Sequence, residues 1–259
     1  MRSAPFFIST DIITIKIKMD YGKENKSFKI GFFDGIPIGL GYLSVSFAFG
    51  IFAVAEGLSI WQTVLISMLN LTSAGQLAGA PIIASGGSFF ELGLTQLVIN
   101  LRYSLMSVSL SQRLGGSVRM RDRFLISFAN TDEVFAVSSG RGEMLGRRYF
   151  YGLIIPPYLG WTFGTLFGAV AGNILPSLAI NALGIAIYAM FIAIIVPVMR
   201  RSVTTALAAL SATALSCLFF YTPVLNKIPS GFVIVICAVT VSALFAIFAP
   251  IPDEEEAEA

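Results

Sequence analysis

One arginine lies inside an apolar stretch of this 259-residue chain, where it could bind an anion. Arg102 comes thirteen residues after the start of an apolar segment at position 89. An arginine at the centre of a bilayer costs from ~2.5 kcal/mol upward, so Arg102 should face a cavity or a partner, or snorkel to the membrane surface. A carboxylate partner would come from the chain itself, in a structural ion pair, or from a substrate. Arg102 is therefore a candidate substrate-binding residue.

Asp132 and Glu133 form the only adjacent acidic pair before the C-terminal tail. Burial would raise their proton affinity, so the pair could couple transport to protons, and it could also be the anionic partner of Arg102. The alternative is a surface turn in which Thr131 or Asp132 caps a helix. Asp132 and Glu133 are candidate coupling residues.

Helix-breaking residues are concentrated at the start of the first apolar segment. They are Gly31, Gly35, Pro37, Gly39 and Gly41, with Asp34 among them. This density predicts an unwound or kinked backbone, whose free polar groups could bind a zwitterionic or ionic substrate. Pro37, Gly39 and Tyr42 are candidate substrate-binding residues on this basis. The alternative is close helix packing through small residues spaced four apart.

A second group of polar and helix-breaking residues interrupts the next apolar segment near its centre. It consists of Asn70, Thr72, Ser73, Gly75, Gln76 and Gly79, followed by Pro81. This pattern predicts a discontinuous helix, which in a membrane protein lines a cavity. Ser73, Gly75 and Gln76 are candidate substrate-binding residues, together with Asn100 in the segment that follows.

The apolar runs that hold these residues indicate a membrane protein. From Tyr149 to Met199 there is no charged residue, and from Ser202 to Pro252 there is only Lys227. A spanning helix needs ~20 apolar residues, so each run is long enough for two crossings. The chain is 56% hydrophobic and 12% charged. The expected fold class is therefore all-α, a polytopic integral membrane protein in a cell membrane.

Seven apolar segments can be placed along the chain. Their approximate limits are 34–56, 60–84, 89–111, 149–172, 176–199, 203–222 and 230–249. An eighth, 124–140, is short and polar, so it could cross within the bundle, form a re-entrant turn or lie on the surface. We expect seven or eight transmembrane helices and slightly favour eight. The transmembrane domain covers residues 31–252. It follows an N-terminal extension, 1–30, in which Met19 could be the true start, and it precedes an acidic tail, 253–259.

The two halves of the chain resemble each other. A shift of 116 positions places Tyr42 on Tyr158 and Phe47 on Phe163, which predicts repeats over about 31–140 and 149–249. Seven crossings would make these repeats inverted, and eight would make them parallel. The positive-inside rule prefers the lysines before the first segment and the seven arginines from Arg113 to Arg148 on one side of the membrane. Neither seven nor eight crossings places all of them there.

Several classes of function are excluded by composition. The chain has no histidine, and its two cysteines lie in apolar runs, so the usual zinc ligand sets and a Ser-His-Asp triad cannot form. No Gly-rich loop ends in Gly-Lys-Ser or Gly-Lys-Thr, so transport would be secondary. We expect a transporter without a cofactor or metal, and not an enzyme. A channel-like pore and a non-transporting membrane scaffold are the alternatives.

The polar motifs, taken in order, resemble the AzlC family of branched-chain amino-acid permeases. The matching stretches are Gly35 to Tyr42, Phe47 to Gly50, Ser73 to Gln76, Asn100 to Tyr103, Thr131 to Phe135, and Trp161 with Phe163 to Thr165 and Gly168. Leu77 and Thr72-Ser73-Ala74 depart from the family pattern. The resemblance implies export of branched-chain or similar apolar amino acids, together with a small membrane subunit of the AzlD type.

Overall fold

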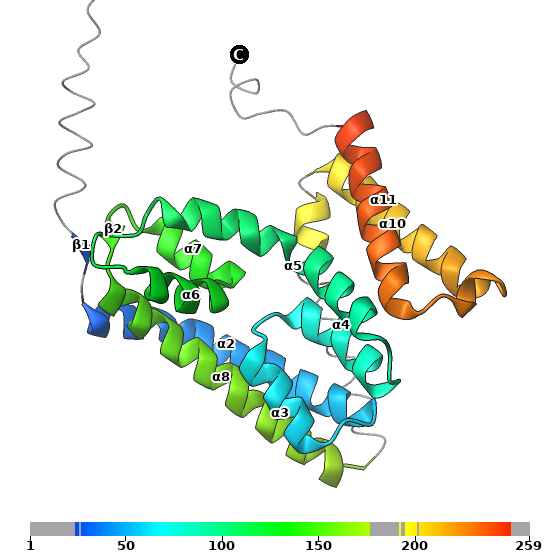
Figure 1. Ribbon diagram of the computed structural model, residues 1–259, viewed down its shortest axis with the longest axis horizontal. Coiled ribbons are helices and arrows are strands. Elements are labelled where there is room, and N and C mark those ends of the chain that lie inside the picture. Colours follow the sequence, from blue (N-terminus) through cyan, green and yellow to red (C-terminus); the bar gives the residue numbers. More distant parts are fainter. Residues whose placement is uncertain (1–23, 26, 177–191, 193–194, 201, 250–259) are drawn as a thin grey trace, which may run out of the picture. The chain divides into compact units, whose positions relative to one another are not determined.

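The structure, a computed structural model, describes residues 24–25, 27–176, 192, 195–200 and 202–249 (Figure 1). Its elements are β1 (Glu24–Asn25), α2 (Phe28–Ala55), α3 (Ile60–Leu69), α4 (Ser73–Ala84), α5 (Phe89–Ser111), α6 (Met120–Phe128), α7 (Asp132–Gly140), β2 (Met144–Leu145), α8 (Arg147–Ile174), α10 (Val203–Tyr221), the 3₁₀ turn η1 (Leu225–Lys227) and α11 (Ser230–Phe248). They form two compact units, residues 1–41 with 103–160, and residues 42–102 with 161–259. Met19, the acidic tail and most of the expected segment 176–199 lie outside the described residues.

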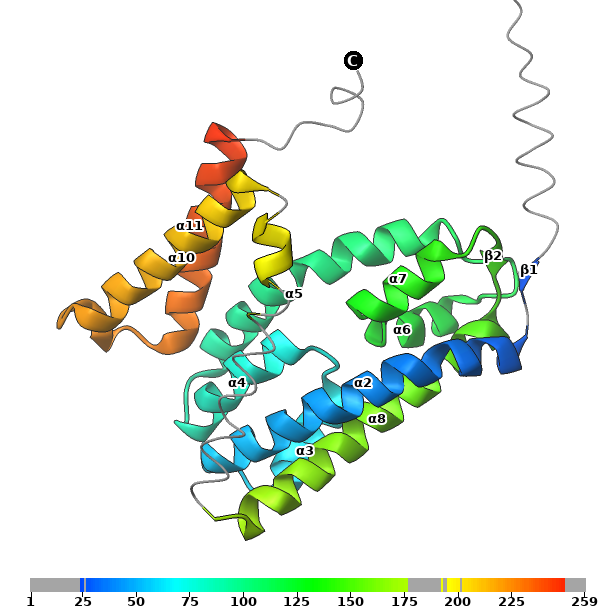
Figure 2. The same cartoon turned by 180° about the vertical axis from the view of Figure 1, so that it is seen from behind.

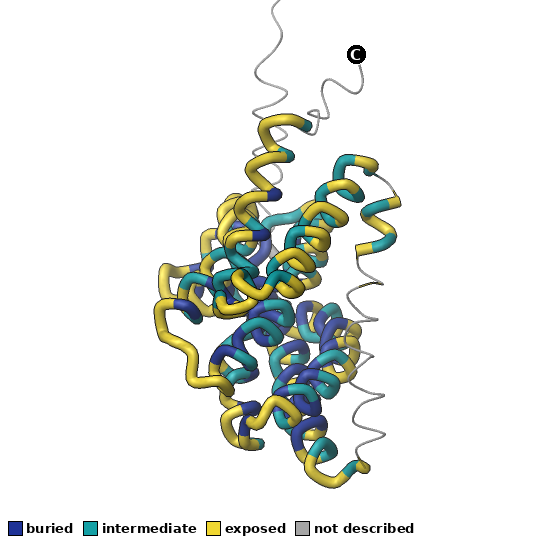
Figure 3. The backbone as a smooth tube through the Cα atoms, turned by 90° about the vertical axis from the view of Figure 1, so that its right-hand side faces the viewer, coloured by how far each residue is buried: buried dark blue, intermediate teal, exposed yellow. Residues whose placement is uncertain are grey.

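The described helices confirm a helical membrane protein. Four of them, α2, α8, α10 and α11, are long and apolar enough to cross a membrane. The 23 residues of α5 extend ~34 Å, which is also sufficient. Many apolar residues on these helices are exposed, and in a bilayer lipid would cover them. Figure 3 shows how exposed and buried residues are distributed along the backbone. The total number of crossings and the internal repeat stay predictions.

The expected segment 60–84 is two helices, so the predicted discontinuity is confirmed. The 10 residues of α3 and the 12 of α4 extend only ~15 and ~18 Å, too short to cross alone. Leu58, before α3, and Ala80, late in α4, share one buried cluster with Ala53 of α2. The residue before α3 and the residue late in α4 therefore lie close together. It follows that α3 and α4 form a hairpin within the second unit.

The segment 124–140 is not one membrane-crossing helix. The slight preference for eight crossings counted it as one, and was wrong in that respect. The helices α6 and α7 have nine residues each and are separated at Ala129–Thr131. Asp122 in the first turn of α6 contacts Tyr151, and Arg141 at the end of α7 contacts Tyr149. Both tyrosines lie at the start of α8. The start of α6 and the end of α7 are therefore close to each other, and the two helices form a hairpin. Both a re-entrant and a surface position for this helical hairpin stay predictions.

The glycine-rich start of α2 is regular helix, so the expected unwinding was wrong. α2 runs without interruption from Phe28 to Ala55 with Pro37 inside it. A Cβ added at Gly31 would lie 2.1 Å from the backbone oxygen of Tyr149, and one at Gly152 would lie 2.2 Å from that of Phe28. Glycines four residues apart share one helix face and let two backbones touch. The alternative of small-residue packing is therefore correct.

This packing also fixes the relative direction of α2 and α8. In the first unit, Gly31 lies against Tyr149 and Gly39 against Pro156. Position numbers rise together along both helices, so α2 and α8 are parallel, and Figures 1 and 2 show them side by side. In a membrane, parallel helices need an odd number of crossings between them. The condition is met if α5 crosses once and the two hairpins do not cross. These hairpins are α3–α4, before α5 in the sequence, and α6–α7, after it.

The N-terminal segment lies beside the arginine-rich stretch. β1 pairs in parallel with β2, with Glu24 opposite Met144 and Asn25 opposite Leu145. This pairing belongs to the first unit, which also contains residues 103–160. The described residues just before α2 and the arginine-rich stretch around β2 therefore share one end of that unit. If neither 60–84 nor 124–140 crosses the membrane, the residues just before α2 and the arginine-rich stretch would lie on one side of it, as the positive-inside rule prefers.

Candidate functional site

A network of uncharged polar side chains fills the break between α3 and α4 in the second unit. The Gln76 amide nitrogen donates to the backbone oxygen of Asn70 at 2.6 Å and to Ser67 Oγ at 3.1 Å. Ser67 Oγ is 2.7 Å from the hydroxyl oxygen of Thr165 on α8. Gln76 is only 1% exposed, and Ser67 and Thr165 are fully buried. The break is thus held by hydrogen bonds that cost no buried charge.

Helix α5 supplies the other wall of this network. Gln96 donates from Nε2 to the backbone oxygen of Gly75 at 2.7 Å and accepts at Oε1 from the amide of Asn70 at 3.3 Å. Asn100, one turn later, donates to the same Oε1 at 3.2 Å. A Cβ at Gly75 would lie 2.6 Å from Gln96 Oε1, so a larger residue here would force the Gln96 side chain to shift and disturb its hydrogen bonds. Gln96 therefore binds α5 to both sides of the break.

The two helix ends at the break carry opposite partial charges. Thr72 is the N-cap of α4 and accepts from the backbone amide of Gly75 at 3.3 Å. The first two amides of α4, those of Ser73 and Ala74, have no acceptor within an α-helix and can bind an anion. The carbonyl end of α3, with Asn70 as its C-cap, favours a cation. A zwitterion matches this arrangement.

The structure places Gly39 and Tyr42, two of the three candidates on α2, in helix packing. Pro37 is exposed, and Gly39 is buried against the backbone of Pro156. Tyr42 is buried, with its ring edge-on to Trp161 at a centroid distance of 5.0 Å. These contacts account for Gly39 and Tyr42 without a ligand. A substrate role for the three stays a prediction.

Arg102 lies on α5 and is exposed. It follows Gln96 by six positions, which rotates it by roughly 120° around the helix from the amide face. Asn100 follows Gln96 by four positions and so shares that face. The geometry therefore brings Asn100, Ser73, Gly75 and Gln76 together at the break and sets Arg102 on another face of α5.

Asp132 and Glu133 form the first turn of α7. Thr131 is the N-cap and accepts from the backbone amide of Val134 at 3.4 Å. Asp132 is half-buried and Glu133 is exposed. Carboxylates in a first turn stabilise a helix through its dipole, so the local structure already gives both residues a role. Their role in coupling stays a prediction.

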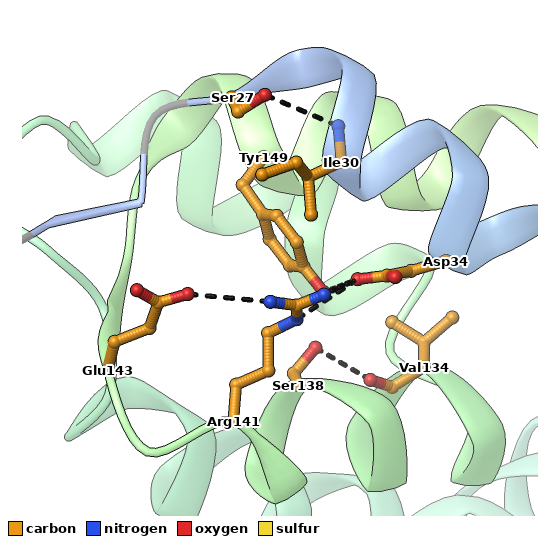
Figure 4. Close-up of polar contacts among 8 residues, drawn as sticks. All are labelled: Ser27, Ile30, Asp34, Val134, Ser138, Arg141, Glu143 and Tyr149. Carbon is orange, nitrogen blue, oxygen red and sulfur yellow. Dashed lines mark hydrogen bonds and ion pairs between the residues drawn. The ribbon is translucent and has the colours of Figure 1, made fainter.

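An ionic cluster in the first unit was not foreseen from the sequence. Asp34 on α2 accepts at Oδ2 from Arg141 Nε at 3.0 Å, from Arg141 Nη2 at 2.5 Å and from the Tyr149 hydroxyl at 2.7 Å. Arg141 also reaches Glu143 at 3.5 Å and lies over the Tyr149 ring (Figure 4). Asp34 is the one acidic residue in α2, which was the available signal. The cluster joins α2, the end of α7 and α8.

A second contact in the first unit joins α6 to α8. Asp122, buried at the start of α6, accepts from the Tyr151 hydroxyl and from the backbone amide of Arg119 at 2.8 Å. The hydrogen bond from Tyr151, with that from Arg119, lowers the pKa of Asp122 against the opposing effect of burial. Asp122 is thus held as a carboxylate that anchors the α6–α7 hairpin.

Two other kinds of site are weaker candidates. An apolar groove of about 540 Å³ in the first unit is lined by aliphatic and aromatic residues, namely Phe28, Leu125, Phe128, Tyr151, Ile154, Ile155, Tyr158 and Leu159. Substrate sites usually add several convergent polar groups, which this lining lacks apart from its tyrosine hydroxyls. Within the described residues no three His, Cys, Asp or Glu side chains are grouped to hold a metal.

Comparison with known proteins gives the family. The AzlC protein family matches residues 37–175, more than half of the chain. "Inner membrane protein YgaZ" of Escherichia coli is 30% identical over 57% of this chain and 62% of its own length. An uncharacterized membrane protein of Archaeoglobus fulgidus is 30% identical over 74% of this chain and 85% of its own length.

A membrane protein of Helicobacter pylori, also uncharacterized, is 25% identical over 57% of this chain. The matched part of the chain spans less than two thirds of the E. coli and H. pylori relatives, 62% and 65%. No solved structure matches. The matched residues include α2 from Pro37, both hairpins and α8, so they contain the whole amide network, and of the ionic cluster they contain Arg141, Glu143 and Tyr149 but not Asp34. By its sequence match and its apolar helices, the chain belongs to the AzlC family of membrane proteins.

Proposed function

We propose that the chain is a secondary transporter which exports branched-chain or similar apolar amino acids. The observation that carries this proposal is the uncharged, buried amide network at the α3–α4 break. Non-helical backbone at membrane depth is tolerated where it is buried in protein or lines a cavity. Discontinuous helices of this kind form the substrate sites of many secondary transporters.

The break suits the backbone part of an amino acid. The amides of Ser73 and Ala74 at the start of α4 would hold the carboxylate, since a helix N-terminus attracts anions. The end of α3 and the amide oxygens of the network would face the ammonium group. Leu71 is buried at the break, and Leu77 packs in the apolar cluster beside α4, so an aliphatic side chain would find apolar surroundings nearby.

We propose further that a small membrane subunit of the AzlD type assembles with the chain. Family membership supports this proposal. A second support is that α10 has no buried residue among those described, although it is long and apolar enough to span the membrane. Helices of a finished bundle usually bury one face. Co-expression of the two subunits, followed by purification through a tag on one of them, tests the assembly.

Counterflow in proteoliposomes tests the transport proposal. Vesicles containing the chain, with and without the small subunit, are loaded with unlabelled leucine, and the uptake of labelled leucine is followed. We expect unlabelled leucine inside the vesicles to accelerate the uptake of labelled leucine severalfold. The reason is that a transporter's binding site returns across the membrane faster with substrate bound than without it. Gln76→Ala should reduce exchange at least tenfold, whereas Gln112→Ala, at an exposed position beyond α5, should not.

Other results would identify the alternatives. Leucine flux that does not depend on leucine in the opposite compartment would mean a channel-like pore. Absence of flux with both subunits present and correctly folded would leave a scaffold role. Leucine efflux from intact cells that overproduce the chain, compared with cells that carry Gln76→Ala, gives the direction of transport.

A further inference from the structure

The orientation of the Gln76 side-chain amide can be deduced from its neighbours. Its Nε2 lies 2.6 Å from the backbone oxygen of Asn70, which can only accept a hydrogen bond. The nitrogen, and not the oxygen, must therefore face Asn70. Gln76 Oε1 then points elsewhere, and it is buried without a donor among the described residues. A buried acceptor left without a donor is costly, so this atom needs an explanation.

The same reasoning extends from Gln96 to Asn100. Gln96 Nε2 lies 2.7 Å from the backbone oxygen of Gly75, so Gln96 Oε1 is the atom that accepts from Asn100 Nδ2. This hydrogen bond uses the nitrogen of Asn100. Its Oδ1 is buried and, like Gln76 Oε1, has no donor in the described part of the chain. The network thus leaves two carbonyl-type oxygens without a partner.

We infer that Gln76 Oε1 and Asn100 Oδ1 bind a small cation. Both atoms can only accept hydrogen bonds or coordinate a positive charge. They belong to one network with the carbonyl end of α3, whose dipole also favours a cation. The cation is the α-ammonium group of the substrate or a Na⁺ ion, because a neutral oxygen can accept a hydrogen bond from the first and coordinate the second. The ammonium reading rests on the proposed function, whereas the Na⁺ reading does not.

Binding to the purified full-length chain tests the inference. The probes are leucine, 4-methylpentanoate, which lacks the ammonium group, and 3-methylbutylamine, which lacks the carboxylate. Each is titrated in NaCl and in choline chloride, and both binding and the thermal unfolding midpoint are measured. An ammonium site should bind leucine and the amine but not the acid, in either salt. A Na⁺ site should raise the unfolding midpoint in NaCl alone.

Two pairs of variants connect the signal to these atoms. Gln76→Met removes the acceptor and should abolish the cation-dependent signal, with Gln112→Met as the exposed control. Asn100→Asp keeps the size and the Oδ1 acceptor and adds a negative charge, although it loses the hydrogen bond from Nδ2 to Gln96 Oε1. In the folded variant it should therefore preserve or strengthen cation binding, with Asn226→Asp as its control. Because Asn100→Asp is isosteric, it remains informative if Gln76→Met does not fold.

Three outcomes would overturn the inference. One is binding of 4-methylpentanoate as strongly as leucine without any Na⁺ dependence, and another is tenfold weaker leucine binding in folded Asn100→Asp. Both would assign the site to a carboxylate. The third is wild-type binding and salt response in folded Gln76→Met, which would mean that the oxygens hold only a structural water.

The inference and the proposed function can fail separately. A Na⁺ effect that depends on Gln76, in a chain that neither binds nor transports leucine, would keep the cation site and refute the amino-acid proposal. Leucine counterflow that persists at the wild-type rate in folded Gln76→Met, with an unchanged response to Na⁺, would keep the transporter and refute the cation site.

Discussion

At the residue scale, Asp34 receives every hydrogen bond of its cluster through one oxygen. Arg141 donates to it from two nitrogens and Tyr149 from its hydroxyl. The side chains of Arg141 and Asp34 are 30% and 24% exposed, so the pair is partly shielded from water. Such a pair is more costly to break than a surface ion pair, because the remaining charge is left without compensation. The cluster therefore holds the end of α7 against α2 and α8.

We predict that Asp34→Asn and Arg141→Gln each destabilise the chain by about 1–3 kcal/mol, less than the ~3–5 kcal/mol of a fully buried pair. The double variant should cost clearly less than the sum of the two. Thermal unfolding of the four proteins in detergent forms the double-mutant cycle. Strictly additive losses would mean that the two side chains do not interact in the folded protein.

Asp122 gives a prediction about pH. Its pKa is lowered below the ordinary value of 3.8 in the folded protein, chiefly by the hydrogen bond from Tyr151. A carboxylate with a lowered pKa adds stability that is complete above the unfolded value and is lost as the pH falls through the folded value. The loss should therefore appear below pH 4. Tyr151→Phe should reduce the stability at pH 7 and flatten its dependence on pH between 5 and 3, measured by the unfolding midpoint.

At the element scale, the two interrupted segments are built alike. In each, an asparagine stands at the break and a threonine caps the following helix, Asn70 with Thr72 and Asn130 with Thr131. Capping satisfies an amide that the break exposes. The α3–α4 break then gains the amide network, whereas in the α6–α7 break Asn130 donates to Ser107 at 3.1 Å. The same local sequence device thus produces two hairpins with different surroundings.

The contact between α2 and α8 predicts a position-specific effect of small substitutions. Gly152→Ala places a methyl group 2.2 Å from the backbone oxygen of Phe28, so the two helices must separate. We expect a lower yield of folded protein and a lower unfolding midpoint. Gly93→Ala on α5, where nothing lies within 4 Å, should be neutral or stabilise by up to ~1 kcal/mol. Equal behaviour of the two variants in size-exclusion chromatography and thermal unfolding would contradict the close packing.

At the scale of the whole molecule, the hairpins decide the topology. Because α3 and α4 return to their starting point, the loop before α3 and the loop after α4 should lie on one side of the membrane. Because β1 pairs with β2, the residues before α2 should share a side with the arginine-rich stretch. α2 is a candidate membrane span, so these two pairs of positions should be on opposite sides. The positive-inside rule makes the basic side cytoplasmic.

Single cysteines test this topology in a chain in which Cys217 and Cys237 are replaced by serine. We expect Ser27→Cys and Gly116→Cys to react with a membrane-impermeant maleimide only in inverted vesicles. Gly57→Cys and Gly86→Cys should react only in intact cells. Labelling of Ser27→Cys and Gly116→Cys from different sides would refute the pairing of β1 with β2 as a cytoplasmic feature.

The sequence by itself determined the class of the protein and the position of one break. Apolar runs without charges allow only a membrane environment, since this property is a sum over local residues. The break after Asn70 was predictable because capping and helix-breaking residues act within one turn of the chain. The family was also recognisable, because its motifs are short and ordered.

Only the tertiary structure decided what the glycines, the acidic residue in α2 and the amides do. Whether a glycine unwinds a helix or admits a neighbour depends on that neighbour, and Gly31 meets a backbone far away in sequence at Tyr149. Asp34 and Arg141 are 107 positions apart, so nothing local connects them. The free oxygen of Gln76 follows from which atom its nitrogen faces. Such three-dimensional contacts are absent from composition and spacing, which is why the sequence favoured Arg102 and the structure directs attention to Gln76 and Asn100.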